Sequence, residues 1–222
     1  NPWGIKVTRW PEDSDIRPIT YAEWQSRQTV PPAPLNITLM EQRASTSPDK
    51  AVHQICLIVN STLYPDIREA MDQYISDLAN DGFSVEVYAS SGGTGPSLRT
   101  FLAGRHAAGV EGAVLIGDLP VAWYETICWE YYEHEEFPCD LFYMDLDGTW
   151  NDSDVNGLYD QHTGTMAPEI WIGRLTASLL TMTGLTEAEL SGLQPLLERA
   201  YAEIAADTVG DHHEELGFWD VP

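Results

Sequence analysis

The amino-acid sequence predicts an α/β fold built on a mostly parallel sheet. Two observations carry this prediction: short continuous apolar runs, and stretches between them in which apolar residues recur at helical spacing. A continuous apolar run is typical of a strand covered on both faces. Strand–helix–strand order with short connections implies right-handed crossovers, and therefore parallel neighbouring strands.

The pattern is clearest between residues 53 and 88. His53–Asn60 is predicted to be a buried strand, and Tyr64–Asn80 carries apolar residues at helical spacing. Gly82 is expected to end that helix, because glycine readily adopts the left-handed conformation found there. Phe83–Tyr88 is the second predicted strand. Residues 35–43, which precede this pattern, are expected to form either one strand or a short irregular segment.

The alternation continues further along the chain. We expect a helix over residues 97–107, a strand over 112–117 and another buried strand over 168–175. A final helix is predicted over residues 186–206, where Thr186 is a candidate N-cap.

Three regions follow from this reading. Residues 1–34 hold three tryptophans and a proline cluster but no sustained period, which predicts an extended arm and a stiff linker. Residues 35–206 are expected to form the α/β domain. Residues 207–222 are expected to form a short acidic tail.

The charge of the chain excludes some partners. Eleven basic residues stand against 35 acidic ones, which gives a formal net charge of −24. Such a surface repels nucleic-acid phosphates and anionic membranes, and no apolar run has the length of a membrane-spanning helix. We therefore expect no nucleic-acid partner and no membrane insertion. A negative charge of this size would favour binding of calcium or of a basic partner, and it is also compatible with a salty medium.

Residues 140–160 are the most informative stretch, with six aspartates, two asparagines and two glycines. Its run from Asp152 to Asp160 has the spacing of a calcium loop, with oxygens at positions 1, 3 and 5, glycine at 6 and a carboxylate at 9. Thr163 stands at position 12, where a bidentate glutamate would complete the loop. We therefore predict a Ca²⁺ site that other carboxylates complete; a solvated turn is the alternative. The predicted ligands are Asp145, Asp147, Asp152, Asp154, Asn156, Asp160 and Glu169.

The chain has three cysteines. Cys56 lies in an apolar strand and is expected to be a small buried hydrophobe. Cys128 and Cys139 flank an acidic, aromatic segment, at a separation compatible with a disulfide in an oxidising compartment; two free thiols are the alternative. Glycosylation sequons begin at Asn36, Asn60 and Asn151, which is compatible with secretion.

No nucleophile and base can be paired from the sequence. Nucleophilic catalysis needs a cysteine or serine within reach of an oriented histidine, and none of the six histidines stands in a glycine-flanked setting at a strand end. We therefore assign no catalytic residue, and enzymatic activity stays open.

Three segments resemble the gingipain-type (C25) cysteine peptidases, which have a caspase-like α/β fold. They are Gly112-Ala-Val-Leu-Ile-Gly-Asp-Leu-Pro120, Asp140-Leu-Phe-Tyr-Met-Asp-Leu-Asp-Gly-Thr-Trp150 and Pro168-Glu-Ile-Trp-Ile-Gly-Arg-Leu175. The resemblance covers about residues 50–200. It implies a three-layer domain, with helices on both faces of a mostly parallel sheet, and metal-binding carboxylates in the aspartate-rich region.

The chain departs from that family after Arg174. Family members carry a catalytic Gly-His and a nucleophilic Cys beyond the Gly-Arg strand, and this sequence has neither. The resemblance therefore transfers no catalytic residue. It implies an incomplete domain, with peptidase activity only where a downstream catalytic half exists.

The expected function is that of a secreted, extracellular, calcium-binding gingipain-like module, part of a cysteine peptidase precursor or a truncated peptidase. The alternative is a non-enzymatic subunit of an extracellular assembly or filament. In that alternative the arm of residues 1–34 docks on a protein partner or a second copy. Burial of Trp3, Trp10 and Trp24 against their own domain would count against it.

Overall fold

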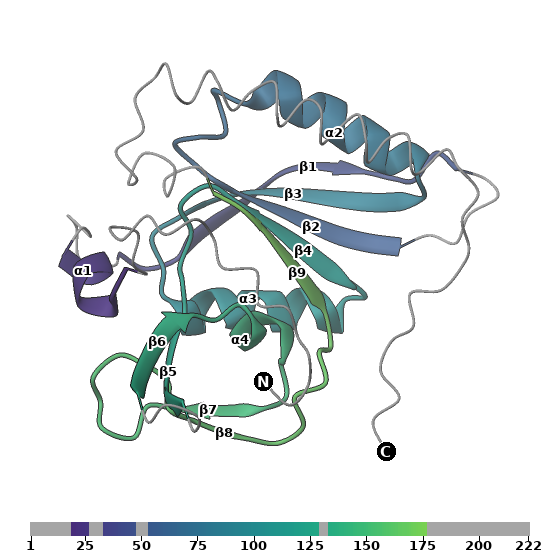
Figure 1. Ribbon diagram of the computed structural model, residues 1–222. Coiled ribbons are helices and arrows are strands. Elements are labelled where there is room, and N and C mark those ends of the chain that lie inside the picture. Colours follow the sequence, from purple (N-terminus) through teal and green to yellow (C-terminus); the bar gives the residue numbers. More distant parts are fainter. Residues whose placement is uncertain (1–18, 27–32, 48–52, 129–132, 177–222) are drawn as a thin grey trace, which may run out of the picture. The chain divides into compact units, whose positions relative to one another are not determined.

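The computed structural model describes residues 19–26, 33–47, 53–128 and 133–176 (Figure 1). The chain divides into two compact units, Asn1–Leu175 and Thr176–Pro222. All of the described residues except Thr176 belong to the first unit. The helix predicted over 186–206 and the tail predicted over 207–222 lie outside the described residues.

A five-stranded sheet in the order β1-β3-β2-β4-β9 forms the centre of the first unit. Its strands are β1 (Asn36–Arg43), β2 (His53–Asn60), β3 (Phe83–Ser91), β4 (Gly112–Ile116) and β9 (Trp171–Leu175). The last four run parallel to their neighbours, and β1 pairs antiparallel with β3 at the edge. The predicted mixed α/β fold with a mostly parallel sheet is confirmed, and residues 35–43 supply a strand.

Helices α2 (Arg68–Asn80) and α3 (Gly95–Ala107) cover opposite faces of the sheet (Figure 1). Strand β2 shows why both faces must be covered, since its five central residues, 55–59, are all buried. Ile55, Leu57 and Val59 pack with Met71 and Ile75 of α2, whereas Cys56 and Ile58 pack with Leu98 and Leu102 of α3. Complete burial of one such aliphatic side chain contributes about 1.5–3 kcal/mol, so the continuous apolar run is the main source of stability here.

The ends of the helices follow from local chemistry. Thr94 caps α3 in a capping box, because its side chain accepts from the Ser97 N–H and the Ser97 hydroxyl accepts from the Thr94 N–H. The helix therefore begins two residues before the predicted start. Gly82, at φ +104°, follows α2 as expected.

The segment between β4 and β9 packs on the same face of the sheet as α3 (Figure 1). It contains the hairpin of β5 (Trp123–Cys128) and β6 (Glu133–Pro138), the short helix α4 (Leu141–Met144), and the small antiparallel pair of β7 (Thr149–Asn151) and β8 (Gln161–Thr163). The sequence patterns did not predict the hairpin, because its strands are acidic and aromatic rather than continuously apolar.

The predicted extended arm is wrong for residues 21–26, which form helix α1 (Tyr21–Ser26). A reciprocal capping box starts this helix: Thr20 Oγ1 accepts from the Glu23 N–H at 3.2 Å, and Glu23 Oε2 accepts from the Thr20 N–H at 3.0 Å. The rest of the predicted arm in residues 1–18 and 27–32 lies outside the described residues.

Gly112 of β4 packs closely against Trp171 of β9. It pairs directly with Trp171, and a Cβ added at Gly112 would lie 2.1 Å from the indole Cε2. We expect Gly112→Ala to displace the indole and to lower the free energy of unfolding in urea by about 1–3 kcal/mol.

Gly173→Ala on the neighbouring β9 is the matched control, because a Cβ there meets nothing within 4 Å. Its unfolding free energy should stay within about 0.5 kcal/mol of the wild type. Equal effects of the two substitutions would contradict the packing argument.

Candidate metal centre

The acidic loop of residues 152–160 connects β7 to β8 and is held against β5. The Glu125 N–H donates to the Tyr159 carbonyl oxygen at 2.8 Å, and the Tyr159 N–H donates to the Trp123 carbonyl oxygen at 2.8 Å. This parallel bridge between Tyr124 and Tyr159 brings a strand of the hairpin beside the far end of the loop. The loop therefore lies on a rigid backbone frame.

The backbone folds around the carboxylate of Asp152. Its Oδ1 accepts from the Asn156 N–H at 3.1 Å, and its Oδ2 accepts from the Gly157 N–H at 2.8 Å. Val155 (φ 63°) and Gly157 (φ 99°) both adopt left-handed conformations. A branched side chain at such a φ is a genuine outlier, and backbone strain of this kind clusters at functional sites. Val155 is also 86% exposed, so packing of its side chain does not impose the conformation.

Three carboxylates converge above this turn. One oxygen each from Glu125, Asp154 and Asp160 lie within 4.8 Å of one another. Calcium–oxygen bonds of about 2.3–2.6 Å place oxygens on opposite sides of an ion about 5 Å apart. The three oxygens are therefore close enough together to hold one metal ion.

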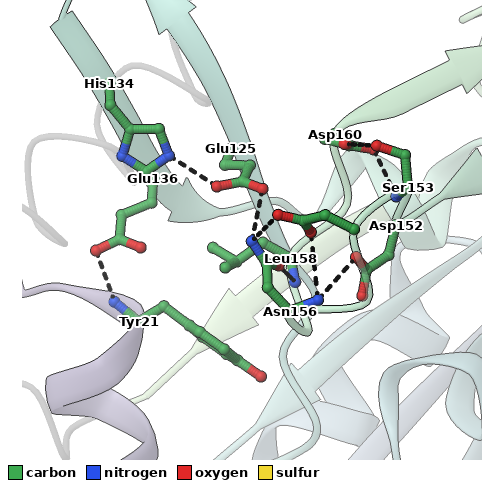
Figure 2. A network of polar contacts seen from close by, with 10 residues as sticks. Tyr21, Glu125, His134, Glu136, Asp152, Ser153, Asn156, Leu158 and Asp160 are labelled. Atoms are coloured by element: carbon green, nitrogen blue, oxygen red, sulfur yellow. Dashed lines mark hydrogen bonds and ion pairs between the residues drawn. The ribbon is translucent and has the colours of Figure 1, made fainter.

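Asn156 bridges two members of this group, and Figure 2 shows it beside Glu125. Its Nδ2 donates to Glu125 Oε1 at 2.8 Å and to Asp154 Oδ2 at 3.2 Å. An amide N–H that bridges two carboxylates supplies part of the positive charge that a cation would supply in full. The amide oxygen, Oδ1, accepts from the Leu158 N–H at 2.8 Å, so the amide would have to give up that bond to present its oxygen to an ion.

Other polar contacts hold the remaining carboxylate oxygens. Ser153 donates to Asp160 from its N–H at 3.0 Å and from its hydroxyl. The hydroxyl contact is the main reason why the pKa of Asp160 is lowered, so this carboxylate is ionised at neutral pH. His134 Nε2 lies 2.7 Å from Glu125 Oε2.

The seven predicted ligands divide into two groups. Asp152, Asp154, Asn156 and Asp160 belong to the loop, where Glu125 of β5 joins them. Asp145, Asp147 and Glu169 form a second group, with one oxygen each within 4.8 Å of one another. The sequence reasoning missed Glu125, because nothing in the local sequence places residue 125 beside residues 154–160.

Asp145 has a structural role in the second group. It is 0% exposed. Its carboxylate accepts from the Gly148 N–H at 2.8 Å and Trp150 Nε1 at 2.9 Å, and Oδ2 lies 2.6 Å from His162 Nε2. Arg99 donates to the carbonyl oxygens of Asp145 and Gly148. These contacts fill most of the carboxylate's capacity as an acceptor, which makes the loop group the better candidate for an ion.

Cys56 and Cys139 have thiols of raised pKa, and each described histidine contacts an oxygen atom. Cys56 is fully buried, and burial, reinforced by the charge of Glu86, raises the pKa of its thiol to about 12. Burial also raises the pKa of the Cys139 thiol. The four described histidines contact oxygens of Glu111, Val110, Glu125 and Asp145.

The disulfide expected between Cys128 and Cys139 is not formed. Cys139 is a free cysteine. In the hairpin, Cys128 pairs with Glu133, whereas Cys139 follows Pro138, which pairs with Trp123 at the other end. Five residue steps along a strand span about 17 Å, and a disulfide requires Cα atoms within about 7 Å.

Comparison with family models, with curated proteins and with solved structures found no match for this chain. Within the described part of the chain, no helix is both long enough and apolar enough to cross a membrane.

The hydrogen bonds of Asp145 predict a large difference between two neighbouring aspartates. Asp145→Ala leaves buried donors of Gly148 and Trp150 without an acceptor, and should lower the free energy of unfolding by about 3–5 kcal/mol. The matched change Asp147→Ala removes an exposed carboxylate and should cost no more than about 0.5 kcal/mol. Urea unfolding of both variants measures this difference, and similar losses would refute the structural role of Asp145.

Thiol labelling tests both cysteine assignments. At about pH 8 a thiol-directed reagent should label Cys139 without prior reduction and should leave Cys56 unlabelled until denaturant is added, because Cys139 is partly exposed whereas Cys56 is fully buried. Peptide mapping by mass spectrometry reads out each site. Labelling of Cys139 only after reduction would indicate a disulfide, and rapid labelling of native Cys56 would indicate an activated thiol.

Proposed function

We propose that this chain is a calcium-binding, gingipain-like α/β module of caspase-like fold, and that the loop of residues 152–160 with Glu125 is its ion site. The observation that carries the proposal is the convergence of three carboxylates, Glu125, Asp154 and Asp160, two of which the Asn156 amide bridges. These carboxylates come from two separate elements and meet on a strained backbone, which a solvated turn does not require.

The contacts among the resembling segments support the gingipain-like fold. Arg174 of β9 binds Asp140 through two nitrogens, Nε at 3.0 Å and Nη2 at 2.7 Å. The Tyr143 hydroxyl donates to the Pro120 carbonyl oxygen at 2.8 Å, and Arg174 Nη2 donates to the same oxygen. Residues from all three segments thus form one interlocked unit, which is a physical reason for the three segments to occur together.

The ion would act by joining separate elements of the chain. It would hold Glu125 of β5 to the loop that ends at β8, and so would fix one side of the segment between β4 and β9. Because an ion that binds only the folded chain shifts the folding equilibrium, it raises stability. The chain's own residues orient the carboxylates, through Ser153 on Asp160 and the backbone N–H groups on Asp152.

The ligand set suggests an extracellular setting. The loop lacks a bidentate glutamate at position 12, and Asn156 and Ser153 partly compensate its carboxylates. Such a site is expected to be weak, with a Kd of about 10⁻⁴–10⁻³ M, the range of extracellular calcium modules. We propose that the chain works outside the cell, where such a site is filled, and that any peptidase activity requires a downstream catalytic half.

The assembly alternative receives less support. Trp24 packs against Trp123 of its own domain, with ring centroids 5.7 Å apart, and this is the arrangement expected to count against an arm that docks on another subunit. Trp3 and Trp10 lie outside the described residues.

Thermal unfolding tests the calcium site. At about 5 mM Ca²⁺ and a Kd of about 0.5 mM, binding stabilises the folded state by about 1.4 kcal/mol, which corresponds to a rise in Tm of about 3–6 °C. We expect this rise relative to chelator for the wild type, and its loss in Glu125→Gln and Asp160→Asn.

Two variants serve as controls for the loss of one negative charge. Asp72→Asn on the exposed face of α2 should keep the full calcium-dependent rise in Tm. Asp147→Asn tests the second group, and it should also keep the rise if the loop holds the ion. An unchanged wild-type Tm with and without calcium would remove the basis of the proposal.

A further inference from the structure

We infer that Asn156 is a site of self-modification: the Gly157 backbone nitrogen attacks the Asn156 carboxamide, ammonia leaves, and the residue becomes aspartate or isoaspartate. The inference goes beyond the proposed function and requires no bound ion. Among the six asparagines of the chain, Asn156 alone is followed by glycine. Glycine has no side chain to shield its nitrogen and has the widest conformational freedom, so this peptide bond is the least hindered one for the reaction.

The Asn156 side chain is already folded toward the nitrogen that attacks it. Its Oδ1 accepts from the Leu158 N–H at 2.8 Å (Figure 2). A side-chain oxygen bonded to the N–H two residues further on forms an Asx turn, which imitates a backbone turn. The turn closes the carboxamide over the Asn156–Gly157 peptide group, so that Cγ faces the Gly157 nitrogen. Groups held in this way need little reorganisation to react.

The Leu158 N–H also stabilises the charge that develops during the attack. Negative charge builds on Oδ1 when Cγ becomes tetrahedral, and a fixed donor at that oxygen lowers the barrier. Leu158 is 5% exposed, so its buried side chain holds the N–H in place. Asn156 and Gly157 are themselves exposed, which gives water access to the product of the attack.

Asp152 contacts the nucleophile. Its Oδ2 accepts from the Gly157 N–H at 2.8 Å, so the carboxylate is in place to take that proton as the nitrogen attacks. A base within hydrogen-bond reach of the proton that it removes accelerates such a step. The loop therefore supplies a nucleophile, a base and a donor at the developing oxyanion around one carboxamide.

The chemistry proceeds through a cyclic succinimide. A bond forms between the Gly157 nitrogen and Asn156 Cγ, the Cγ–Nδ2 bond breaks, and Nδ2 leaves as ammonia after it gains a proton from water. The proton of the Gly157 nitrogen passes through Asp152 to the solvent. Water then opens the ring at either of its carbonyl groups, which yields aspartate or isoaspartate.

Asn60 provides a matched comparison within the same chain. Its Oδ1 accepts from the Thr62 N–H at 2.9 Å, so it forms the same Asx turn. The next residue is Ser61, whose N–H donates to the Ser90 carbonyl oxygen at 2.8 Å and not to a carboxylate. Asn60 therefore has the turn without the glycine and without the base, and we expect it to stay unmodified.

Modification changes the contacts that Asn156 makes. Its Nδ2 donates to Glu125 Oε1 at 2.8 Å and to Asp154 Oδ2 at 3.2 Å. Aspartate or isoaspartate replaces this donor with another carboxylate, and like charges at this distance repel each other. The loop should therefore loosen as the chain ages.

Peptide mapping of the aged chain tests the inference. The full chain is incubated in neutral buffer with a chelator, and mass spectrometry follows the conversion of each asparagine. We expect Asn156 to convert about fivefold or more faster in the native chain than in the same chain held unfolded in guanidinium chloride. Asn60 should stay unconverted in the native chain. Equal or slower conversion of native Asn156 would overturn the inference.

Two isosteric substitutions test the part that Asp152 plays. Asp152→Asn keeps an oxygen that can accept the Gly157 N–H but removes the basic carboxylate, and it should slow the native conversion of Asn156 by about tenfold or more. Asp147→Asn makes the same change of charge at an exposed residue outside the loop, and the rate should stay that of the wild type. Equal rates in the two variants would refute the role of Asp152 as base.

Thermal unfolding tests the consequence for the loop. Asn156→Asp imitates one product of the reaction and should lower Tm by about 3 °C or more. Asn151→Asp is the matched control, because it adds the same charge at another exposed asparagine of the chain, and its Tm should fall by less. Equal shifts of the two variants would contradict the loosening of the loop.

Discussion

The buried carboxylate of Asp145 holds the part of the chain that carries the acidic loop. It accepts from Trp150 of β7 and contacts His162 of β8, and these are the two strands that the loop connects. A buried carboxylate is tolerated only when donors surround it, so this residue requires β7, β8 and the turn through Gly148 to stay together. Arg99 of α3 ties the same turn to the central sheet. The position of the loop therefore depends on a carboxylate that is itself fully buried.

Hydrogen-bond donors within the loop offset the repulsion between its carboxylates. Asp152 is satisfied by backbone N–H groups, Asp160 by Ser153, and Glu125 and Asp154 by the Asn156 amide. These donors allow the carboxylates to lie together, and they also compete with an ion for the same oxygens. In the proposed calcium site such compensation would favour weak binding, even in a chain with a net charge of −24.

The sequence predicted the sheet better than the surface features. Strand 53–60 and the helix that follows it were recognisable because their apolar patterns are local and strong. Helix α1 had a local signal too, the capping box of Thr20 and Glu23, but the prolines and tryptophans around it favoured an extended arm. The described structure also shows no disulfide between Cys128 and Cys139. Sequence separation allowed Cys128 and Cys139 to meet, whereas the hairpin register places them at opposite ends of two strands.

By itself, the sequence determined the α/β class, the buried strands and the density of carboxylates in residues 152–160, because apolar periodicity and closely spaced carboxylates are local properties. The tertiary structure decided which carboxylates meet. It placed Glu125 beside Asp154 and Asp160, and it placed Asp145, Asp147 and Glu169 in a separate group. The physical reason is that these contacts depend on the pairing of β5 with Tyr159 and on the burial of Asp145 between β7 and β8. Pairings between distant segments follow from packing of the whole domain, which no local pattern encodes.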